Sequence, residues 1–415
     1  MSQTIRSRAK AIAWLLMLVY FASYTTRINF AVMLVKICSD MNMEKTALAI
    51  VLTGLTITYG GGQIISGLLG DKIKAQRMLT VGLCIACTAN VVMSFCSNVA
   101  LMTVVWCVNG FAQAMLWPPI VRLMSMYLTD REYGYTAVRL YWGSSLATIM
   151  LYLVCPLLLY VMSWRIVMLL CAAIGVGILV AWVVLNPRLF TDLVAIASTP
   201  ATDDTEKHTR VPLPSFVYLP IVLIMLGIAL QGVLRDGVTN WMPFYLQETF
   251  HIPEENAIIS TVILAVFSII SFSFFDFLFR KVFQNEVFCA AVIFVGSAVC
   301  AGALYLSNLF SASVVISMLL MALIVAFMHG VNLMLITIVP KRFLKSGKVA
   351  TYSGLFNAFT YIGAAASTYG FAALSEAFGW SFTILTWIII SVCGALVCLA
   401  ATPIWKKFRS EYSDL

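Results

Sequence analysis

Residues 164–186 read WRIVMLLCAAIGVGILVAWVVLN, a run of 23 residues with one charged side chain. An α-helix rises about 1.5 Å per residue, so about 20 apolar residues are enough to cross the hydrocarbon core of a bilayer. The stretch therefore predicts a membrane-spanning helix. Similar runs recur along the whole chain, and they decide the class of fold that we expect.

The composition indicates the same class of protein. Of the 415 residues, 61% are hydrophobic and 11% are charged, whereas an ordinary soluble domain has about 25% charged residues. A water-soluble fold of this length could not bury so much apolar surface. We therefore expect an all-α membrane protein. A soluble enzyme and a nucleic-acid-binding protein are excluded.

Twelve segments have the length and composition of a transmembrane helix. They are 11–35, 47–70, 78–97, 99–127, 134–162, 164–186, 216–246, 257–280, 286–307, 310–340, 349–375 and 380–404. Lys and Arg collect in cytoplasmic loops. If the N-terminus is cytoplasmic, 19 of the 26 Lys and Arg residues lie on that side and three lie on the other. We therefore expect a multi-pass protein of the cell (inner) membrane with both termini in the cytoplasm.

The longest polar stretch lies near the middle of the chain and divides it. Residues 1–186 are predicted to form an N-terminal six-helix bundle, 187–215 a cytoplasmic linker, and 216–415 a C-terminal six-helix bundle with a short basic tail. The halves repeat each other weakly, since Arg27 in the first helix matches Arg235 in the seventh. Two parallel six-helix repeats around a central site are typical of the major facilitator fold.

Arg27 and Arg235 lie inside apolar segments, where an arginine at the helix centre costs about 2.5 to 3.5 kcal/mol on insertion scales. A guanidinium group stays charged and matches a phosphate or carboxylate with two hydrogen bonds. The pair therefore predicts a binding site for a small anion. The alternative is a structural arginine paired with a deep carboxylate, for which Asp236 and Asp276 are the candidates. Adjacent helix positions point apart, so pairing of Arg235 with Asp236 stays open.

Other polar residues fall at helical spacing near the two arginines, and they are expected to line the binding site. They are Tyr24, Gln113, Gln231, His329, Asn332, Asn357 and Tyr361. Each could instead hold two helices together with a hydrogen bond. If transport is coupled to protons, His329 is the leading titratable candidate and Asp236 is its rival.

A second group of charges lies where the second and third predicted helices meet. Asp71, Lys72 and Arg77 are close together in this loop, and Arg122 lies near the cytoplasmic end of the fourth helix. A carboxylate beside a basic loop can bind neighbouring helix ends, so we expect these four residues to act in gating. An ordinary polar loop is the alternative.

Three motifs surround these residues. The first helix contains TTRINF at 25–30, the fourth contains NGFAQAMLWPPIVR at 109–122, and the seventh contains LRDGVTNWMPFYL at 234–246. These motifs resemble those of the organophosphate:phosphate antiporter family of the major facilitator superfamily, and the resemblance extends over nearly the whole chain. It implies that Arg27 and Arg235 bind the phosphate group of the substrate.

The chain departs from this family at several positions. Asp236 follows Arg235 where an uncharged residue is usual. Gln63 stands where glycerol-3-phosphate transporters carry a lysine, and an ungapped count places Ser144 where they carry a histidine. We expect both residues to line the site, and the departures leave open which anion is carried.

The resemblance implies a monomeric secondary transporter that works by alternating access. The expected substrate is a phosphorylated or other anionic metabolite, exchanged for inorganic phosphate. A proton- or sodium-coupled organic-anion symporter is one alternative, and a membrane sensor of sugar phosphate is another. The 11 cysteines lie mostly inside apolar runs without metal-ligand spacing to histidine, so we expect no metal and no cofactor.

Overall fold

The computed structural model describes residues 3–43, 45–197, 211–253, 260–310 and 313–413. The chain forms two compact units. Unit 1 comprises Met1–Val211 together with Leu344–Leu355, and unit 2 comprises Pro212–Phe343 together with Phe356–Leu415.

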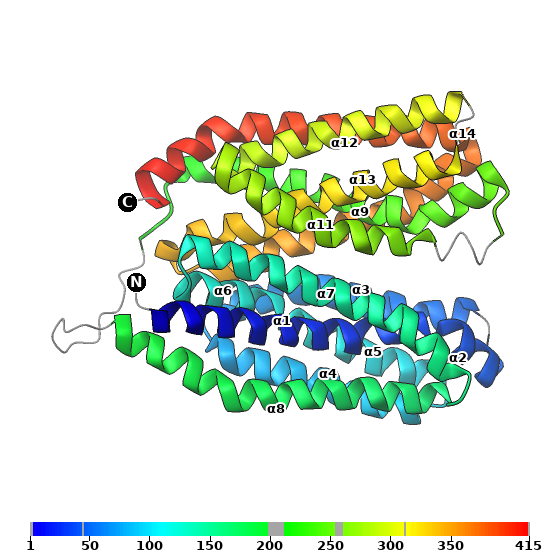
Figure 1. Cartoon of the computed structure of the whole chain (residues 1–415), viewed down its shortest axis with the longest axis horizontal. Helices are drawn as coiled ribbons and strands as arrows, with labels where there is room; N and C mark the ends of the chain where they lie inside the picture. The colour runs from blue at the N-terminus through cyan, green and yellow to red at the C-terminus, as the bar shows by residue number, and fades with distance from the viewer. Residues whose placement is uncertain (1–2, 44, 198–210, 254–259, 311–312, 414–415) are drawn as a thin grey trace. The chain divides into compact units, whose positions relative to one another are not determined.

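Unit 1 is built from long helices that pack in pairs. Its elements are α1 (Gln3–Val32), α2 (Leu34–Met41), α3 (Lys45–Gly70), α4 (Ala75–Phe95), α5 (Val99–Ala114), α6 (Trp117–Tyr127), α7 (Asp130–Leu159) and α8 (Trp164–Ala197). Helix α1 packs on α7, α3 on α5, and α4 on α8 (Figure 1). The start of α7 has a capping box, in which Thr129 and Glu132 satisfy backbone groups of the first turn.

The fourth predicted helix, 99–127, is divided into α5 and α6. Pro118 and Pro119 are the first residues after Trp117 in α6. A proline has no backbone N–H, so neither residue can donate to the carbonyl one turn earlier. The chain therefore leaves the helix at Met115 and Leu116 and starts a new one.

The sixth predicted helix is longer than expected, because α8 continues through Pro187 to Ala197. Phe190 gives the physical reason. It is buried and packs on Tyr127 and Trp182, with ring centroids 5.2 and 6.1 Å apart. The part of the expected linker that lies between 187 and 197 is therefore helical, and 198–210 lies outside the described residues.

Unit 2 contains η1 (Ser215–Val217), α9 (Tyr218–Phe250), α11 (Val262–Leu278), η2 (Phe279–Phe283), α12 (Glu286–Leu309), α13 (Val314–Asn332) and η3 (Leu333–Ile338). Helix α13 contacts α9, α11 and α12. The elements η4 (Val339–Ser346), α14 (Val349–Phe408) and η5 (Arg409–Ser413) complete the chain.

Helix α14 has two arms. Gly379 lies between them with φ 77° and ψ 175°, a backbone conformation that favours glycine. The predicted segments 349–375 and 380–404 lie in the first and second arms. Eleven helical segments among the described residues are long and apolar enough to cross a membrane, and the last of these is Gly370–Tyr412.

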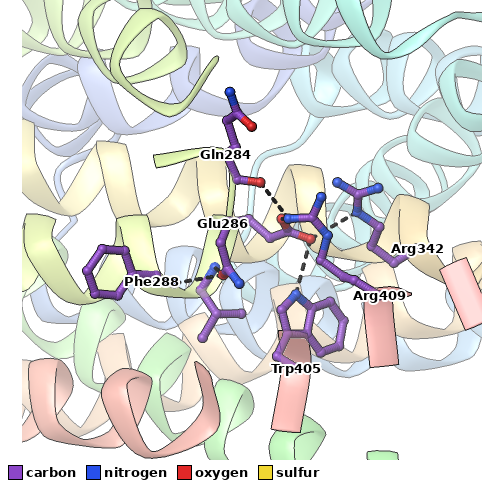
Figure 2. A network of polar contacts seen from close by, with 8 residues as sticks. Gln284, Glu286, Phe288, Arg342, Trp405 and Arg409 are labelled. Atoms are coloured by element: carbon purple, nitrogen blue, oxygen red, sulfur yellow. Dashed lines mark hydrogen bonds and ion pairs between the residues drawn. The ribbon is translucent and has the colours of Figure 1, made fainter. Parts of the chain in front are cut away.

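A buried carboxylate joins three segments of unit 2 (Figure 2). Glu286, at the start of α12, is 0% exposed. Its Oε1 lies 3.0 Å from Nε of Arg342 and accepts a hydrogen bond of 3.1 Å from Nε1 of Trp405. Its Oε2 lies 3.1 Å from Nη1 of Arg409, which also donates to the carbonyl of Gln284. The carboxylate thereby connects α12 with η4 and with the end of α14.

Glu286→Gln is expected to lower the thermal stability of the purified chain strongly, because two partly buried guanidinium groups lose their buried counter-charge. Breaking a buried ion pair on one side costs about 3 to 5 kcal/mol. Thermal unfolding in detergent measures the effect. The control is Glu411→Gln, because Glu411 forms an exposed pair with Lys407 at 3.9 Å. Equal unfolding temperatures for the two variants would contradict a stabilising role for the Glu286 network.

Candidate functional site

Arg27 of α1 rests against aromatic rings in unit 1. Its guanidinium carbon lies 4.2 Å from the ring centroid of Tyr24 and 4.8 Å from that of Tyr59 on α3. The electron-rich faces of such rings attract a cation. The rings therefore help to hold this charge inside an apolar helix.

The rings beside Arg27 belong to a larger aromatic cluster. Tyr20 packs on Tyr24 at 5.2 Å and on Trp117 at 5.4 Å, and Trp117 packs on Tyr141 at 5.7 Å. The cluster thus joins α1, α3, α6 and α7. Three members of the cluster are not among the residues predicted to line the site: Tyr20, Tyr59 and Tyr141. Tyr20 could have been found, because Tyr20, Tyr24 and Arg27 are spaced i, i+4, i+7 and share one helix face.

Gln113 lies within this unit, and both ends of its amide bind α1. Its Oε1 accepts a 2.6 Å hydrogen bond from Ser23, and its Nε2 donates to Oγ1 of Thr26 at 2.9 Å. Asn109 and Asn90 both donate to the carbonyl of Thr26, at 3.0 and 2.7 Å. These contacts fix α5 and α4 against the residue before Arg27. In this structure Gln113 positions the arginine, and its contact with an anion stays a prediction.

Gln63 and Ser144 have different surroundings. Gln63 lies one helical turn after Tyr59, is 0% exposed, and has no hydrogen-bond partner for either amide atom among the described residues. A buried amide without partners is costly. Ser144 donates a 2.8 Å hydrogen bond to the carbonyl of Tyr141 on the same helix. Their roles in binding remain predictions.

Arg235 of α9, in unit 2, is held by its neighbour in the sequence. Nε and Nη2 of Arg235 lie 2.6 and 2.9 Å from the two carboxylate oxygens of Asp236. Arg235 and Asp236 therefore form the ion pair that helix geometry left open, because the long arginine side chain can bend to the carboxylate of the next residue. The side chains are 15% and 26% exposed.

Four helices of unit 2, α9, α11, α13 and α14, approach each other near Arg235. Gln231, one turn earlier, donates a 3.2 Å hydrogen bond to the carbonyl of Met328 on α13. His329 follows and packs on Phe272 of α11 with centroids 5.1 Å apart. A Cβ at Gly232 would collide with the carbonyl of Thr360, so glycine allows α9 and α14 to lie in direct backbone contact there.

The remaining polar candidates of unit 2 lie on two of these helices. Asn332 is 6% exposed on α13, Asn357 is 9% exposed on α14, and Tyr361 is half-buried one turn after Asn357. The backbone contact at Thr360 brings the adjacent Tyr361 to the level of Gly232. Whether these side chains bind an anion stays a prediction.

The expected gating residues divide into two groups. Asp71 caps the start of α14: its oxygens accept hydrogen bonds of 2.9 Å from the N–H of Ala350 and 2.8 Å from that of Thr351. A carboxylate stabilises the positive end of a helix. Arg122 donates to the carbonyls of Gly70 and, at 3.0 Å, Ile73 on either side of Asp71. Lys72 and Arg77, by contrast, are exposed.

Glycines allow the close approach that this cap requires. A Cβ at Gly67 would lie 2.8 Å from the carbonyl oxygen of Ala350. A Cβ at Gly354 would collide with the backbone carbonyl of Gln63. The end of α3 and the first turns of α14 are therefore in backbone contact within unit 1.

The chain belongs to the Major Facilitator Superfamily, because the sequence pattern of that family matches residues 16–368. It resembles the proton:xylose symporter XylE with a TM-score of 0.75, 13% identity, and coverage of 94% of this chain and 95% of that one. At this identity the likeness shows the fold. Together with the eleven apolar spans among the described residues, it defines a multi-pass membrane protein.

Curated relatives confirm the resemblance to organophosphate transporters. The chain is 30% identical over 115 residues to the probable hexose phosphate transport protein of Chlamydia trachomatis, which is 28% of this chain and 25% of that protein. The match thus spans about a quarter of that relative. The glycerol-3-phosphate transporter of Bacillus subtilis is 25% identical over 92% of this chain and 89% of its own length. The membrane sensor protein UhpC of Escherichia coli is 22% identical with the same coverage.

Asp71→Asn should loosen the start of α14, because the amide keeps the shape of the cap but loses its charge. Loss of a negative charge at a helix N-terminus costs about 0.3 to 1 kcal/mol, and the amide NH₂ group cannot accept the second hydrogen bond. The readout is maleimide labelling of Ser353→Cys, a position that is 0% exposed, in a background without other cysteines. Labelling should become several-fold faster with Asp71→Asn.

The matched control is Asp40→Asn, which removes the same charge from an exposed pair with Lys36. Labelling of position 353 should not change in this variant. Equal labelling rates with Asp71→Asn and Asp40→Asn would contradict the capping role.

Proposed function

We propose that this protein is a secondary transporter that carries a small organophosphate across the cell membrane by alternating access, in exchange for inorganic phosphate. The observation that carries the proposal is Arg27, a permanent charge inside an apolar helix and bordered by tyrosines. Its family and the names of its relatives support transport of a phosphorylated solute.

The chemistry around Arg27 suits a tetrahedral oxyanion. A guanidinium group offers paired N–H donors that match two oxygens of a phosphate. The hydroxyl groups of Tyr24 and Tyr59 are further donors within the same cluster. Moving the guanidinium from the rings to an anion replaces a cation–π contact with charge-assisted hydrogen bonds, which are stronger. The aromatic rings therefore hold the guanidinium group when no ligand is bound, and an anion can replace them.

The proposed binding set combines both units. Arg27 and Arg235 contact the anion, and the polar residues around each arginine position it or contact the organic part of the substrate: Tyr24, Gln63, Gln113, Ser144, Gln231, His329, Asn332, Asn357 and Tyr361. Gln63 has the strongest individual support in this set, because both atoms of its buried amide lack a hydrogen-bond partner among the described residues. A polar substrate could supply that partner.

The proposed topology has twelve spans and two cytoplasmic termini, with bundles at 1–186 and 216–415 joined by 187–215. The first arm of α14 is the eleventh span and the second arm is the twelfth. The asymmetry of Lys and Arg supports the orientation. In this topology Asp71 and Arg122 form a cytoplasmic latch at the start of α14. Lys72 and Arg77, which are exposed, add positive charge to that loop.

A sensor is the second candidate function. Two relatives are named membrane sensor protein UhpC, at 24% identity over 55% and 22% over 92% of this chain. A sensor would bind the same class of anion without moving it, so binding and flux must be measured separately. A proton-coupled symporter is the alternative within transport, with His329 or Asp236 as the group that carries the proton.

Arg27→Lys and Arg235→Lys should each impair substrate binding at least tenfold. Lysine keeps the positive charge but loses the planar pair of donors. The measurement is the dissociation constant for glycerol 3-phosphate, glucose 6-phosphate and inorganic phosphate with the purified variants. Arg165→Lys is the control, since Arg165 donates to the carbonyls of Ser94 and Cys96 away from the aromatic cluster. Unchanged affinity in either of the first two variants would contradict a two-point grip on the anion.

Proteoliposomes loaded with inorganic phosphate should take up the substrate without a pH gradient. In an exchanger, each anion must leave before the other binds, and the empty carrier reorients poorly. Uptake into vesicles loaded with phosphate is compared with uptake into vesicles loaded with buffer, at equal and at unequal pH.

Two results would reject phosphate exchange. Uptake that follows the pH step, ignores internal phosphate and becomes pH-independent in His329→Gln would show a proton symporter. Saturable binding with no flux under any gradient would show a sensor.

A further inference from the structure

The two arginines of the proposed site have different surroundings. Arg27 rests on the rings of Tyr24 and Tyr59, 4.2 and 4.8 Å from their centroids. Arg235 instead has the carboxylate of Asp236 on its Nε and Nη2 groups, at 2.6 and 2.9 Å. A ring leaves the net charge of an arginine at +1, whereas a carboxylate reduces the charge of the pair to zero.

The pair is built into a single turn of α9. Both residues are partly accessible, at 15% and 26% of the side chain, so an anion can approach them. Thr239 donates to the carbonyl of Arg235 at 2.6 Å and holds the backbone of this turn. An anion that binds Arg235 therefore meets a fixed negative charge a few ångströms away.

We infer that Asp236 is a specificity-determining residue that selects anions by charge. This carboxylate weakens the binding of a doubly charged oxyanion more than that of a singly charged one of the same shape, because it repels each added negative charge on the ligand. This inference rests on the proposed function. It narrows the substrate class to organic monoanions, such as phosphodiesters, sulfate esters, sulfonates and singly protonated phosphate monoesters.

Repulsion by Asp236 is reduced by solvent and by the guanidinium group beside it. We expect selectivity of about tenfold for each additional ligand charge, which corresponds to about 1.4 kcal/mol. A phosphate monoester carries a charge of about −1.5 to −2 at pH 7, whereas a sulfate ester of the same alcohol carries one. The two esters have nearly the same size and shape, so their comparison isolates charge.

The experiment measures dissociation constants of glucose 6-phosphate and glucose 6-sulfate, and of ethyl phosphate and ethyl sulfate, with the purified full chain at pH 7.5. Asp236→Asn keeps the size of the side chain and removes its charge. The ratio of phosphate affinity to sulfate affinity should rise about tenfold over the wild type. Asp236→Glu, which keeps the charge, should leave the ratio near the wild-type value.

The matched control is Asp276→Asn. Asp276 binds Nε of Arg280 through both of its oxygens at 2.9 Å, so it forms a similar ion pair in the same unit on α11. This variant should not change the ratio. If Asp236→Asn is too unstable to purify, Asp236→Ser gives the same comparison with a smaller neutral side chain.

Two results would overturn the inference alone. One is an unchanged ratio in Asp236→Asn, and the other is an equal loss of affinity for both esters, which would mean that Asp236 only positions Arg235. In both cases the wild type still binds anions and Arg235→Lys still weakens binding. If the wild-type chain binds none of the four esters and no inorganic phosphate, the proposed function fails and the inference fails with it.

Discussion

The structure depends on how a membrane protein keeps positive charge inside its apolar helices. An arginine in such a helix is costly unless it has a partner. Unit 1 surrounds Arg27 with tyrosine rings, and unit 2 places a carboxylate against Arg235. The first arrangement includes cation–π contacts, which charge-assisted hydrogen bonds to a ligand can replace. The second compensates the charge, and we infer that it limits which ligand binds.

Among the residues that the structure describes, the polar ones around the arginines are of two kinds: those that hydrogen-bond a neighbouring helix, and one buried amide that does not. Gln113, Asn109 and Asn90 connect α5 and α4 to the turn of α1 that precedes Arg27, so they hold the backbone of α1 next to the arginine. Gln231 does the same for α9 through the carbonyl of Met328. Gln63 differs, because its buried amide has no hydrogen-bond partner in the described part of the chain. It is the position where a change of residue could alter the substrate most directly.

The sequence predicted the helices well, because the length of an apolar run is set by the thickness of the bilayer. The predicted span 99–127 matches the candidate span Val99–Tyr127, although Pro118 and Pro119 divide its helix in two. The burial of Phe190 extends the helix of another predicted span. The arginines could be predicted from their cost in the membrane. The aromatic cluster could not be predicted in full, since Tyr59 and Tyr141 join it from other helices, and a single sequence does not show which helices are neighbours. The pairing of Asp236 with Arg235 depended on a side-chain conformation that helix spacing does not determine.

The central claim is that the arginine of each unit takes part in binding one oxyanion. Equilibrium binding of radiolabelled inorganic phosphate to the purified chain tests it most directly. We predict saturable binding with one phosphate per chain, displaced competitively by an organophosphate, and lost when Gln replaces either Arg27 or Arg235. Two phosphates per chain, or binding that survives the loss of either arginine, would contradict the claim.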